Sequence, residues 1–288
     1  MKVALITPWD NAWIPHFERI FVSRGHQFGV FKSQAPKDSD IVLHGWAAGT
    51  PVVPTAKNVV FLRRYELFDG GLTRVNWKHV QALICVSSWI KALAERILKE
   101  NEVSVPTHLI YNGVDLDKWT FSERNPGKKI GMACYINSKK NLPLAMQIFS
   151  ALPKGYELHI AGELQDVCLG EYLNHIANCT GREIHIYGQV PAKHMNEWWD
   201  GMDYCLSTSM TEGNPNNVIE AMAKGIKPVV HNWPGSEDQF PDDLRFSTVP
   251  EAITVLTSSY ESERYKNLVK EKFSLTNFET VADLALSL

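Results

Sequence analysis

Two glutamates eight positions apart, Glu212 and Glu220, are the residues of this sequence best suited to bind a sugar nucleotide. Glu212 stands in a loop rich in Gly, Asn and Pro, and Glu220 stands inside the helix predicted to follow that loop. An ionised carboxylate offers two acceptor oxygens and no donor. We therefore expect Glu212 to accept hydrogen bonds from sugar hydroxyls and Glu220 to accept two from a ribose 2′,3′-diol.

The start of the same helix is a candidate anion site. Asn216 or Asn217 is expected to cap the helix, and Gly225 stands where the helix is expected to end. Free backbone N–H groups and the positive end of the helix dipole favour a bound diphosphate. The alternative is an ordinary capped helix with a surface glutamate. The small residues at 221–223 and the flanking elements favour the binding site.

Composition limits the class of protein. The chain has 288 residues, 44% of them hydrophobic, and a net charge of −3 without a block of like charges, so it gives no strong signal for nucleic acid or for an anionic membrane. Its five cysteines form no C-x-x-C pair, and no apolar run is long enough for a signal peptide or a membrane helix. We expect a cytoplasmic protein with reduced thiols. The sequence shows no D-x-D in a suitable setting and no spaced His/Cys set, so we expect no metal and no cofactor.

Short apolar runs alternate with helical patterns along the whole chain, which is typical of βαβ units on parallel sheets. Strands are predicted at residues 3–7, 27–31, 40–44, 59–62, 82–86, 107–111, 130–134, 157–161, 183–187, 204–207 and 227–231. Helices are predicted at residues 17–23, 88–99, 142–151, 171–178, 194–201 and 216–224, with a last helix over roughly 260–288. The fold class is therefore α/β, with doubly wound parallel sheets.

A turn signal at 112–115 and a polar stretch at 122–129 divide the chain. We place one domain at residues 1–118 and a second at residues 119–264, with the C-terminal helix at about 265–288 packing back on the first domain. Ligands of doubly wound sheets bind beyond the carboxyl ends of the strands. We therefore expect the two Rossmann-like domains to face each other across a ligand cleft.

Four segments in order resemble the retaining nucleotide-sugar glycosyltransferases of family 4, which have the GT-B fold. These are the strand and serines at 83–88, the Asn-Gly-Val-Asp segment at 112–115, the two glutamates with the small residues after them at 207–225, and the strand at 226–230. Each motif alone is weak, whereas four in the right order and spacing are specific. The resemblance covers most of the chain and is stronger after residue 82.

The resemblance implies roles for residues of the second domain. Glu212 would contact the donor sugar and Glu220 the donor ribose, while the amides of Gly213, Asn214 and Asn217 would approach the diphosphate and sugar. Family members also neutralise the diphosphate with an arginine and a lysine about five residues apart. The candidates for the lysine are Lys140 and its neighbour Lys139, but Tyr135 stands where the arginine is expected. A tyrosine donates one hydrogen bond, whereas an arginine gives a charged, bidentate contact.

The first domain supplies the acceptor-side candidates. The loop after its first strand carries Trp9, Asp10, Trp13 and His16 instead of the glycines common in the family. Its tryptophans suit stacking on a sugar or another flat partner, or else packing against a neighbouring domain.

A histidine near the reacting sugar is usual in the family. The catalytic candidate is His44 at a predicted strand tip, with His16 and His79 as rivals. Arg64 and Glu66 stand where a histidine-bearing loop is expected, and are candidates for positioning the substrate.

The reaction expected from this resemblance is transfer of a sugar from a nucleoside diphosphate to a hydroxyl acceptor, with retention of anomeric configuration. UDP is the expected nucleotide, with GDP and ADP as alternatives. The acceptor class stays open between a glycan, a lipid-linked glycan, a protein and a modified nucleobase. The rival functions are a glycoside hydrolase that uses the two glutamates, a sugar-nucleotide epimerase on the same fold, and a non-catalytic sugar-nucleotide-binding subunit.

Overall fold

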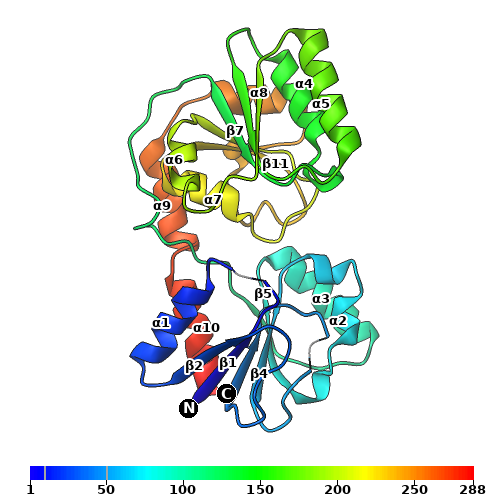
Figure 1. The fold of residues 1–288 in the computed structure, drawn as a ribbon. Helices are drawn as coiled ribbons and strands as arrows, with labels where there is room; N and C mark the ends of the chain where they lie inside the picture. Colours follow the sequence, from blue (N-terminus) through cyan, green and yellow to red (C-terminus); the bar gives the residue numbers. More distant parts are fainter. Residues whose placement is uncertain (10, 50) are drawn as a thin grey trace. The chain divides into compact units, whose positions relative to one another are not determined.

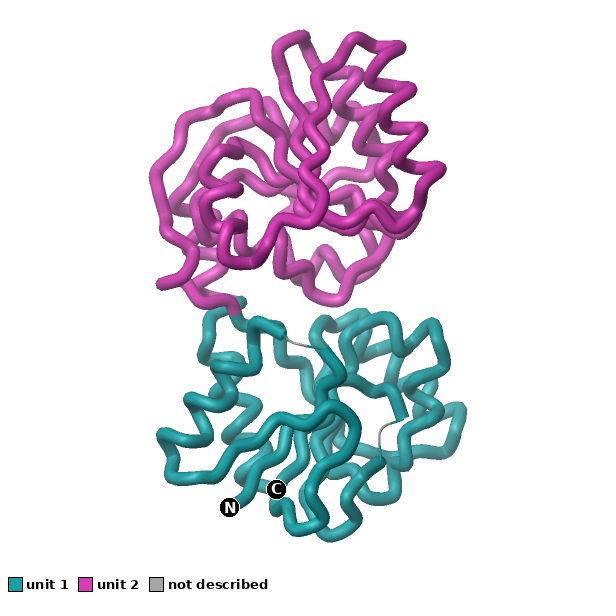
Figure 2. Tube along the Cα trace, viewed as in Figure 1, with its two compact units in different colours: residues 1–113, 273–288 teal, residues 114–272 magenta. Residues whose placement is uncertain are grey.

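The chain forms two compact units (Figure 2). The structure is a computed structural model that describes residues 1–9, 11–49 and 51–288. Unit 1 contains residues 1–113 and 273–288, and unit 2 contains residues 114–272. The change of unit falls after residue 113, whereas the sequence led us to expect it near 118.

Unit 1 is built on a parallel sheet of six strands in the order β2-β1-β3-β4-β5-β6 (Figure 1). The strands are β1 (Lys2–Ile6), β2 (Gln27–Phe31), β3 (Ile41–His44), β4 (Lys57–Leu62), β5 (Val80–Cys85) and β6 (Thr107–Leu109). The order reverses direction between β1 and β3, so the carboxyl ends of these two strands flank a topological switch point.

Helices cover both faces of this sheet. On one face α1 (Ile14–Ser23) and the C-terminal α10 (Thr276–Ser287) share a hydrophobic core with β1, β3, β4 and β5. On the other face α2 (Gly71–Arg74) and α3 (Ser88–Glu100) pack against β4 and β5. Ser87 caps α3 by accepting a hydrogen bond from the backbone of Ile90, as its position before the apolar pattern predicts. Two short 3₁₀ turns, η1 (Tyr65–Leu67) and η2 (Trp77–His79), complete the unit.

Unit 2 repeats the architecture, again with six parallel strands, in the order β12-β11-β10-β7-β8-β9. The strands are β7 (Lys129–Ala133), β8 (Glu157–Ala161), β9 (Ile184–Gly188), β10 (Tyr204–Ser207), β11 (Lys227–His231) and β12 (Arg245–Phe246). Here the order reverses between β7 and β10. Each strand predicted from the sequence is confirmed within one or two residues, and the two-residue β12 is an addition.

The faces of the second sheet are also covered by helices. The larger core lies between the sheet and α4 (Leu142–Ala151), α5 (Val167–Thr180) and α8 (Val249–Thr257). The opposite face carries α6 (Met195–Asp200), α7 (Asn216–Ala223) and α9 (Ser262–Lys272), of which α7 packs against α9 (Figure 1). The 3₁₀ turns are η3 (Ser138–Lys140) and η4 (Asp242–Leu244).

The expectation of one continuous C-terminal helix over 260–288 is wrong. The chain forms α9 and α10 with a break between Lys272 and Thr276, and the two helices belong to different units. Phe273 at this break is fully buried and its ring meets Tyr111 edge-on at 5.3 Å. The helices bury their apolar faces in separate cores, which a single straight helix would not achieve.

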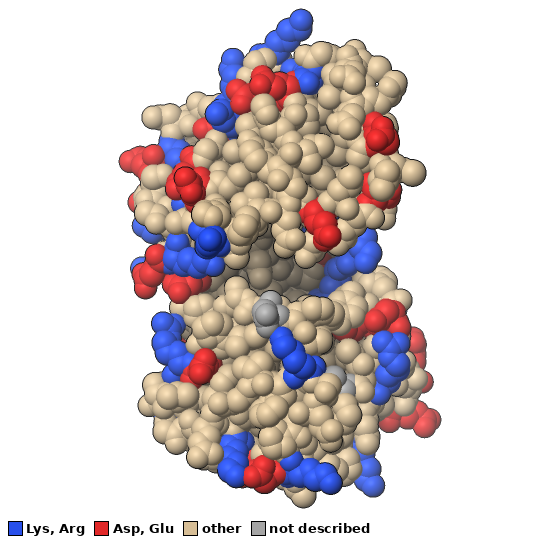
Figure 3. All heavy atoms as spheres, viewed as in Figure 1, with Lys and Arg blue, Asp and Glu red and all other residues tan. Residues whose placement is uncertain are grey.

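The surface carries no concentrated charge on the face shown in Figure 3, where basic and acidic side chains lie scattered among other residues. None of the described helices is both long enough and apolar enough to cross a bilayer. All five cysteines are free thiols, and burial raises the pKa of Cys85 to about 12 and that of Cys134 to about 11.

Candidate functional site

The residues expected to bind the donor gather at the switch point of the second sheet. Lys140 follows β7, and Glu212 follows β10, which is the neighbour of β7 in the sheet. Because the two strands are parallel, their carboxyl ends meet at one edge, and the connections leave this edge in opposite directions. Such a reversal leaves a crevice in which doubly wound sheets bind their ligands.

Lys140 and Glu212 form an ion pair at this point. Lys140 Nζ lies 2.5 Å from Glu212 Oε1, and the side chains are 21% and 15% exposed respectively. A charged hydrogen bond at this depth is less screened than one at the surface. The pair holds an ammonium group and a carboxylate side by side, which is the combination needed to bind a phosphate and a sugar hydroxyl.

Neighbouring side chains fix the pair. Ser209 donates a hydrogen bond of 2.7 Å from Oγ to Glu212 Oε1, and Thr208 donates one of 2.7 Å to the carbonyl oxygen of Lys140. His231, the last residue of β11, donates from Nδ1 to the carbonyl oxygen of Ser209 at 2.9 Å. These contacts tie the ends of three elements together. They orient both charged groups before any ligand arrives.

Helix α7 begins without a side-chain cap, which corrects the expectation that Asn216 or Asn217 is the capping residue. The N-cap position is Pro215, and the two asparagines are the first residues of the helix. The helix ends as expected, because Gly225 has a φ of +80° and donates its N–H to Met222. The helix start therefore offers an anion backbone N–H groups that no side chain of the capping position covers.

The loop before α7 is held by a buried glutamine. Gln239 donates from Nε2 to the carbonyl oxygens of Gly213 and Gly235, each at 3.0 Å. Its Oε1 accepts a hydrogen bond of 2.8 Å from the side chain of Asn214. The side-chain carboxamide of Asn214 thus makes a hydrogen bond that holds the loop. A contact of this loop with a diphosphate would be made by the backbone, as the sequence led us to expect.

Glu220 lies one turn inside α7 and is half-buried. Burial raises the pKa of its carboxyl to about 7, and the ammonium group of Lys118 opposes this shift. A half-buried carboxylate that titrates near neutrality is weakly solvated, so hydroxyl groups of a ligand can replace missing water contacts. This property suits the role expected for Glu220, a clamp on a ribose diol.

Tyr135 and Lys139 both lie at the surface of unit 2. Tyr135 is 49% exposed, and Lys139 is exposed in the 3₁₀ turn η3, where its carbonyl oxygen accepts a hydrogen bond from Met210. Lys140 is the lysine paired with Glu212, so of the two candidate lysines it lies closer to the other expected site residues.

Aromatic side chains gather at the switch point of the first sheet. Trp9 follows β1 and Trp46 follows β3, and their rings meet edge-on at 5.0 Å. Tyr65 lies 5.3 Å from Trp46 and 6.2 Å from Trp9. Trp9 is 50% exposed, so part of its ring is open to a ligand. This group, Trp9 with Trp46 and Tyr65, is called the aromatic cluster below.

Three acceptor-side or catalytic expectations are corrected by burial. Trp13 is 7% exposed and packs in the unit 1 core, where its ring stacks with Phe61, so it is not available to stack on a sugar. His44 is the last residue of β3, as expected, but its side chain is 1% exposed. Glu66 is fully buried, and its carboxylate accepts backbone hydrogen bonds from Ala47, Arg63 and Arg64.

The histidine belongs to an internal network. His44 Nε2 lies 3.0 Å from Asn58 Oδ1, which also accepts from the backbone of Val53, while Asn58 Nδ2 donates to three carbonyl oxygens. His44 therefore donates from Nε2 to the asparagine oxygen. Burial lowers the pKa of this imidazole, which favours its neutral form.

The remaining acceptor-side candidates lie at or near the surface. His16 is half-buried and stacks on Phe278 at 5.7 Å, and Arg64 is half-buried with its guanidinium 5.8 Å from the ring of Phe68. Asp10 lies outside the described residues.

Sequence reasoning missed several residues at these two places. Arg63 is buried with its guanidinium 4.6 Å from the ring centre of Trp13 and 5.0 Å from that of Trp46, and burial lowers its pKa to about 10. It donates to the carbonyl oxygen of Gly45 at 3.1 Å and so holds the loop after β3. A charged residue directly after an apolar strand was the available signal. Trp46, Tyr65 and His231 were missed because their partners lie far away in the sequence, whereas Ser209 lies only three positions from its partner Glu212.

The structure also brings together residues that the sequence did not reveal as a metal-ligand set. Glu157, His159 and His185 in β8 and β9 place ligand atoms within 4.8 Å of one another. They lie toward the amino ends of their strands, away from the switch point. The ligand patterns considered in the sequence were His/Cys spacings and D-x-D, and this mixed Glu/His group is neither of these.

Comparisons with known proteins agree with this architecture. A sequence model of the family described as "Glycosyl transferases group 1" matches residues 127–250. The structure superposes on Anabaena HepE, solved with UDP and glucose, with a TM-score of 0.78, 12% identity and 100% of each chain covered. It superposes on a glycosyltransferase from Rickettsia africae with a TM-score of 0.73, 12% identity, and 99% and 97% of the two chains covered.

A third solved structure of the same fold is the sucrose-phosphate synthase of Thermosynechococcus elongatus. Its TM-score is 0.74 at 10% identity, with 99% of this chain and 98% of that chain covered. No curated protein sequence matches the chain significantly. At these identities the structural likeness shows the GT-B fold, and the family match over 127–250 supports a glycosyltransferase that acts on nucleotide sugars.

Proposed function

We propose that this protein transfers a glycosyl group from a nucleoside-diphosphate sugar to a hydroxyl acceptor, with retention of anomeric configuration and without a catalytic metal. The observation that carries the proposal is the Lys140–Glu212 ion pair at the β7/β10 switch point. The uncapped start of α7 and the clamp residue Glu220 stand in the same segment of the chain. UDP is the proposed nucleotide, because HepE of the same fold was solved with UDP and with UDP-glucose.

The proposed mechanism assigns each group one task. Glu220 binds the ribose diol, and Glu212 binds hydroxyls of the donor sugar and so holds its anomeric carbon in place. Lys140 and the backbone N–H groups at the start of α7 stabilise the charge that develops on the departing diphosphate. No divalent cation is assigned to this step, since these groups supply the positive charge.

The bonds broken and formed in this reaction are balanced, and no protein base is required. The bond between the anomeric carbon and the diphosphate oxygen breaks, and the acceptor oxygen bonds to the same face of that carbon. The proton of the acceptor hydroxyl passes to a departing phosphate oxygen. The route assigns no proton transfer to His44, whose side chain is buried.

The aromatic cluster is the proposed acceptor platform. Sugar rings stack on exposed aromatic faces, and Trp9 is half-exposed beside Trp46 and Tyr65. The net charge of −3 without a block of like charges favours an uncharged acceptor such as a glycan over a duplex nucleic acid.

The first test is a calorimetric titration with UDP, GDP, ADP and their common sugar adducts. We expect micromolar binding of one nucleotide by the wild-type chain, and loss of that binding in Glu220→Ala. The matched control is Glu197→Ala, because Glu197 lies on α6 of the same unit with 87% of its side chain exposed. Glu212→Ala should keep nucleoside-diphosphate binding and lose sugar transfer.

The same panel separates the alternatives. No binding of any nucleotide by the wild type would overturn the proposal. Binding without transfer to any acceptor would favour a non-catalytic sugar-nucleotide-binding subunit, which the tyrosine at position 135 also suggests. Conversion of the nucleotide sugar without an acceptor would favour an epimerase, and cleavage of glycosides without a nucleotide would favour a hydrolase.

A further inference from the structure

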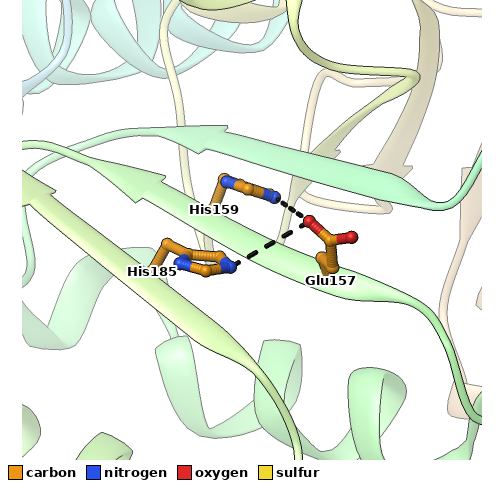
Figure 4. Close-up of side chains that lie close together, drawn as sticks. All are labelled: Glu157, His159 and His185. Atoms are coloured by element: carbon orange, nitrogen blue, oxygen red, sulfur yellow. Dashed lines mark hydrogen bonds and ion pairs between the residues drawn. The ribbon is translucent and has the colours of Figure 1, made fainter.

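Two neighbouring strands of unit 2 carry the same short pattern, Glu-x-His-Ile. It occurs at residues 157–160 in β8 and at residues 183–186, which begin just before β9. The pairs Leu158↔Ile184 and His159↔His185 place the two patterns in register. Because side chains alternate between the faces of a sheet, both histidines and both glutamates project from one face. Figure 4 shows three of these four side chains converging.

The distances within the group are those of a metal site. His159 Nε2 lies 3.1 Å from Glu157 Oε2, and His185 Nε2 lies 3.2 Å from Glu183 Oε1. His185 Nε2 also lies 4.0 Å from Glu157 Oε2. In a tetrahedral zinc site with bonds of 2.0–2.1 Å, neighbouring ligand atoms lie about 3.3 Å apart. Glu157, His159 and His185 place their ligand atoms within 4.8 Å of one another, so small side-chain movements would bring these three residues to that spacing.

The arrangement is unfavourable without a cation. The carboxylates of Glu157 and Glu183 both lie within 4.0 Å of His185 Nε2, and two like charges this near to one atom repel each other. Lys129 Nζ is the nearby cation, 3.9 Å from Glu157, but its side chain is 48% exposed. His185 Nε2 is shielded from solvent and makes no hydrogen bond of normal geometry, although the Glu183 carboxylate lies 3.2 Å away, so this nitrogen is available to a cation.

A second layer of contacts orients the buried histidine. His159 Nδ1 lies 2.8 Å from the hydroxyl of Tyr187, and the rings of His159 and His185 stack at 4.5 Å. Histidines that bind metals usually use their other ring nitrogen in such a hydrogen bond, which fixes the tautomer. Tyr187 in turn meets Trp198 of α6 edge-on at 6.0 Å, so the partner is itself held by packing.

We propose that Glu157, His159 and His185 bind a Zn²⁺-type divalent cation through two imidazole nitrogens and one carboxylate oxygen, and that the exposed carboxylate of Glu183 turns in to complete the set. The ligand set is that of zinc rather than magnesium, which prefers oxygen ligands alone. Glu183 and His185 are 65% and 36% exposed, so the ion has a path from solvent. The metal crosslinks β9, the edge strand of the sheet, to β8 and stabilises that edge. It stands apart from the switch point and takes no part in sugar transfer.

The test is a Zn²⁺ titration of the chelator-treated full chain. Cys179 lies 3.5 Å from His175, so the experiment is made with Cys168→Ser and Cys179→Ser to remove competing exposed thiols. We expect one Zn²⁺ per chain and a higher thermal midpoint with zinc. His185→Ala and Glu183→Gln should each weaken binding at least tenfold. His194→Ala is the matched control, because this histidine is 54% exposed on the same unit, and its affinity should equal that of the parent.

A direct readout comes from the nitrogen resonances of the histidine rings. Zinc should shift Nε2 of His159 and His185 and leave His194 unchanged. Absence of stoichiometric binding, or equal affinity in His185→Ala, Glu183→Gln and the parent, would overturn the proposal. UDP binding is measured on the same metal-free sample. It should persist there, so that failure of the metal site is distinguishable from failure of the proposed transferase function.

Discussion

Glu220 makes the folded protein less stable at neutral pH than a neutral residue of the same shape would. Burial raises the pKa of its carboxyl from 4.5 to about 7. Below pH 4.5 the group is protonated in the folded and the unfolded chain, so it contributes nothing. Between pH 4.5 and 7 the folded chain keeps a proton that the unfolded chain has lost. The free energy of unfolding therefore falls as the pH rises through this window.

The size of the effect follows from the two pKa values. At 1.36 kcal/mol for each pKa unit, a carboxyl raised from 4.5 to about 7 lowers the free energy of unfolding by about 3 kcal/mol above pH 7. Glu220→Gln keeps the shape of the side chain and removes its charge. We expect the difference between variant and wild type to be constant below pH 4.5 and to grow by about 3 kcal/mol by pH 8.

The assay is urea-induced unfolding of wild type and variant at a series of pH values from 4 to 8. If the chain unfolds in more than one transition, the free energy is taken from the transition that the substitution shifts. A constant offset caused by the new amide cancels, because only the change with pH is compared. Glu197→Gln on the exposed face of α6 is the control, and its difference from wild type should not vary with pH in this way. A flat difference for Glu220→Gln, or one that falls as the pH rises, would refute the reasoning about burial.

Two further predictions concern transfer. Lys140→Met should lower turnover by about 10²–10³, which is the usual effect of removing one group that stabilises developing charge. Lys139 is exposed, so Lys139→Met should change turnover less than tenfold. Equal losses, or a larger loss for Lys139→Met, would show that the lysine was misassigned. Trp9→Ala should raise the KM for the acceptor about tenfold, from loss of ~1–1.5 kcal/mol of ring contact, without altering the Kd for UDP. Phe68→Ala, at an aromatic residue that is 61% exposed, is the control, and an unchanged acceptor KM in Trp9→Ala would exclude the aromatic cluster as the platform.

The strands and the alternation of the fold were predictable because they depend on local patterns. Buried strands of a parallel sheet are short apolar runs, and each one predicted from the sequence is present. The C-terminal helix was harder, because its break depends on two separate cores and not on a proline or glycine within 260–288.

The site was predictable only where a motif fixed it. The loop and helix around Glu212 and Glu220 were recognisable from spacing, and the structure adds the Lys140 contact across 72 positions of the chain. The part of the first unit before residue 82 offered no motif, so the burial of His44, Trp13 and Glu66 followed from packing that the sequence does not display. The paired Glu-x-His patterns were not singled out in the sequence, and only the strand register shows that they lie side by side.

The return of α10 to unit 1 has a consequence for the order in which the protein is made. Four residues of this helix, Phe278, Val281, Ala282 and Ala285, belong to the core built around α1. Residues 114–272 form unit 2 without a contribution from either end of the chain. During synthesis, domains usually fold in order from the N-terminus. Here the N-terminal unit must wait until α10 has left the ribosome, so unit 2 is the first that can complete its core. A premature stop within α10 would therefore damage the unit that was synthesised first.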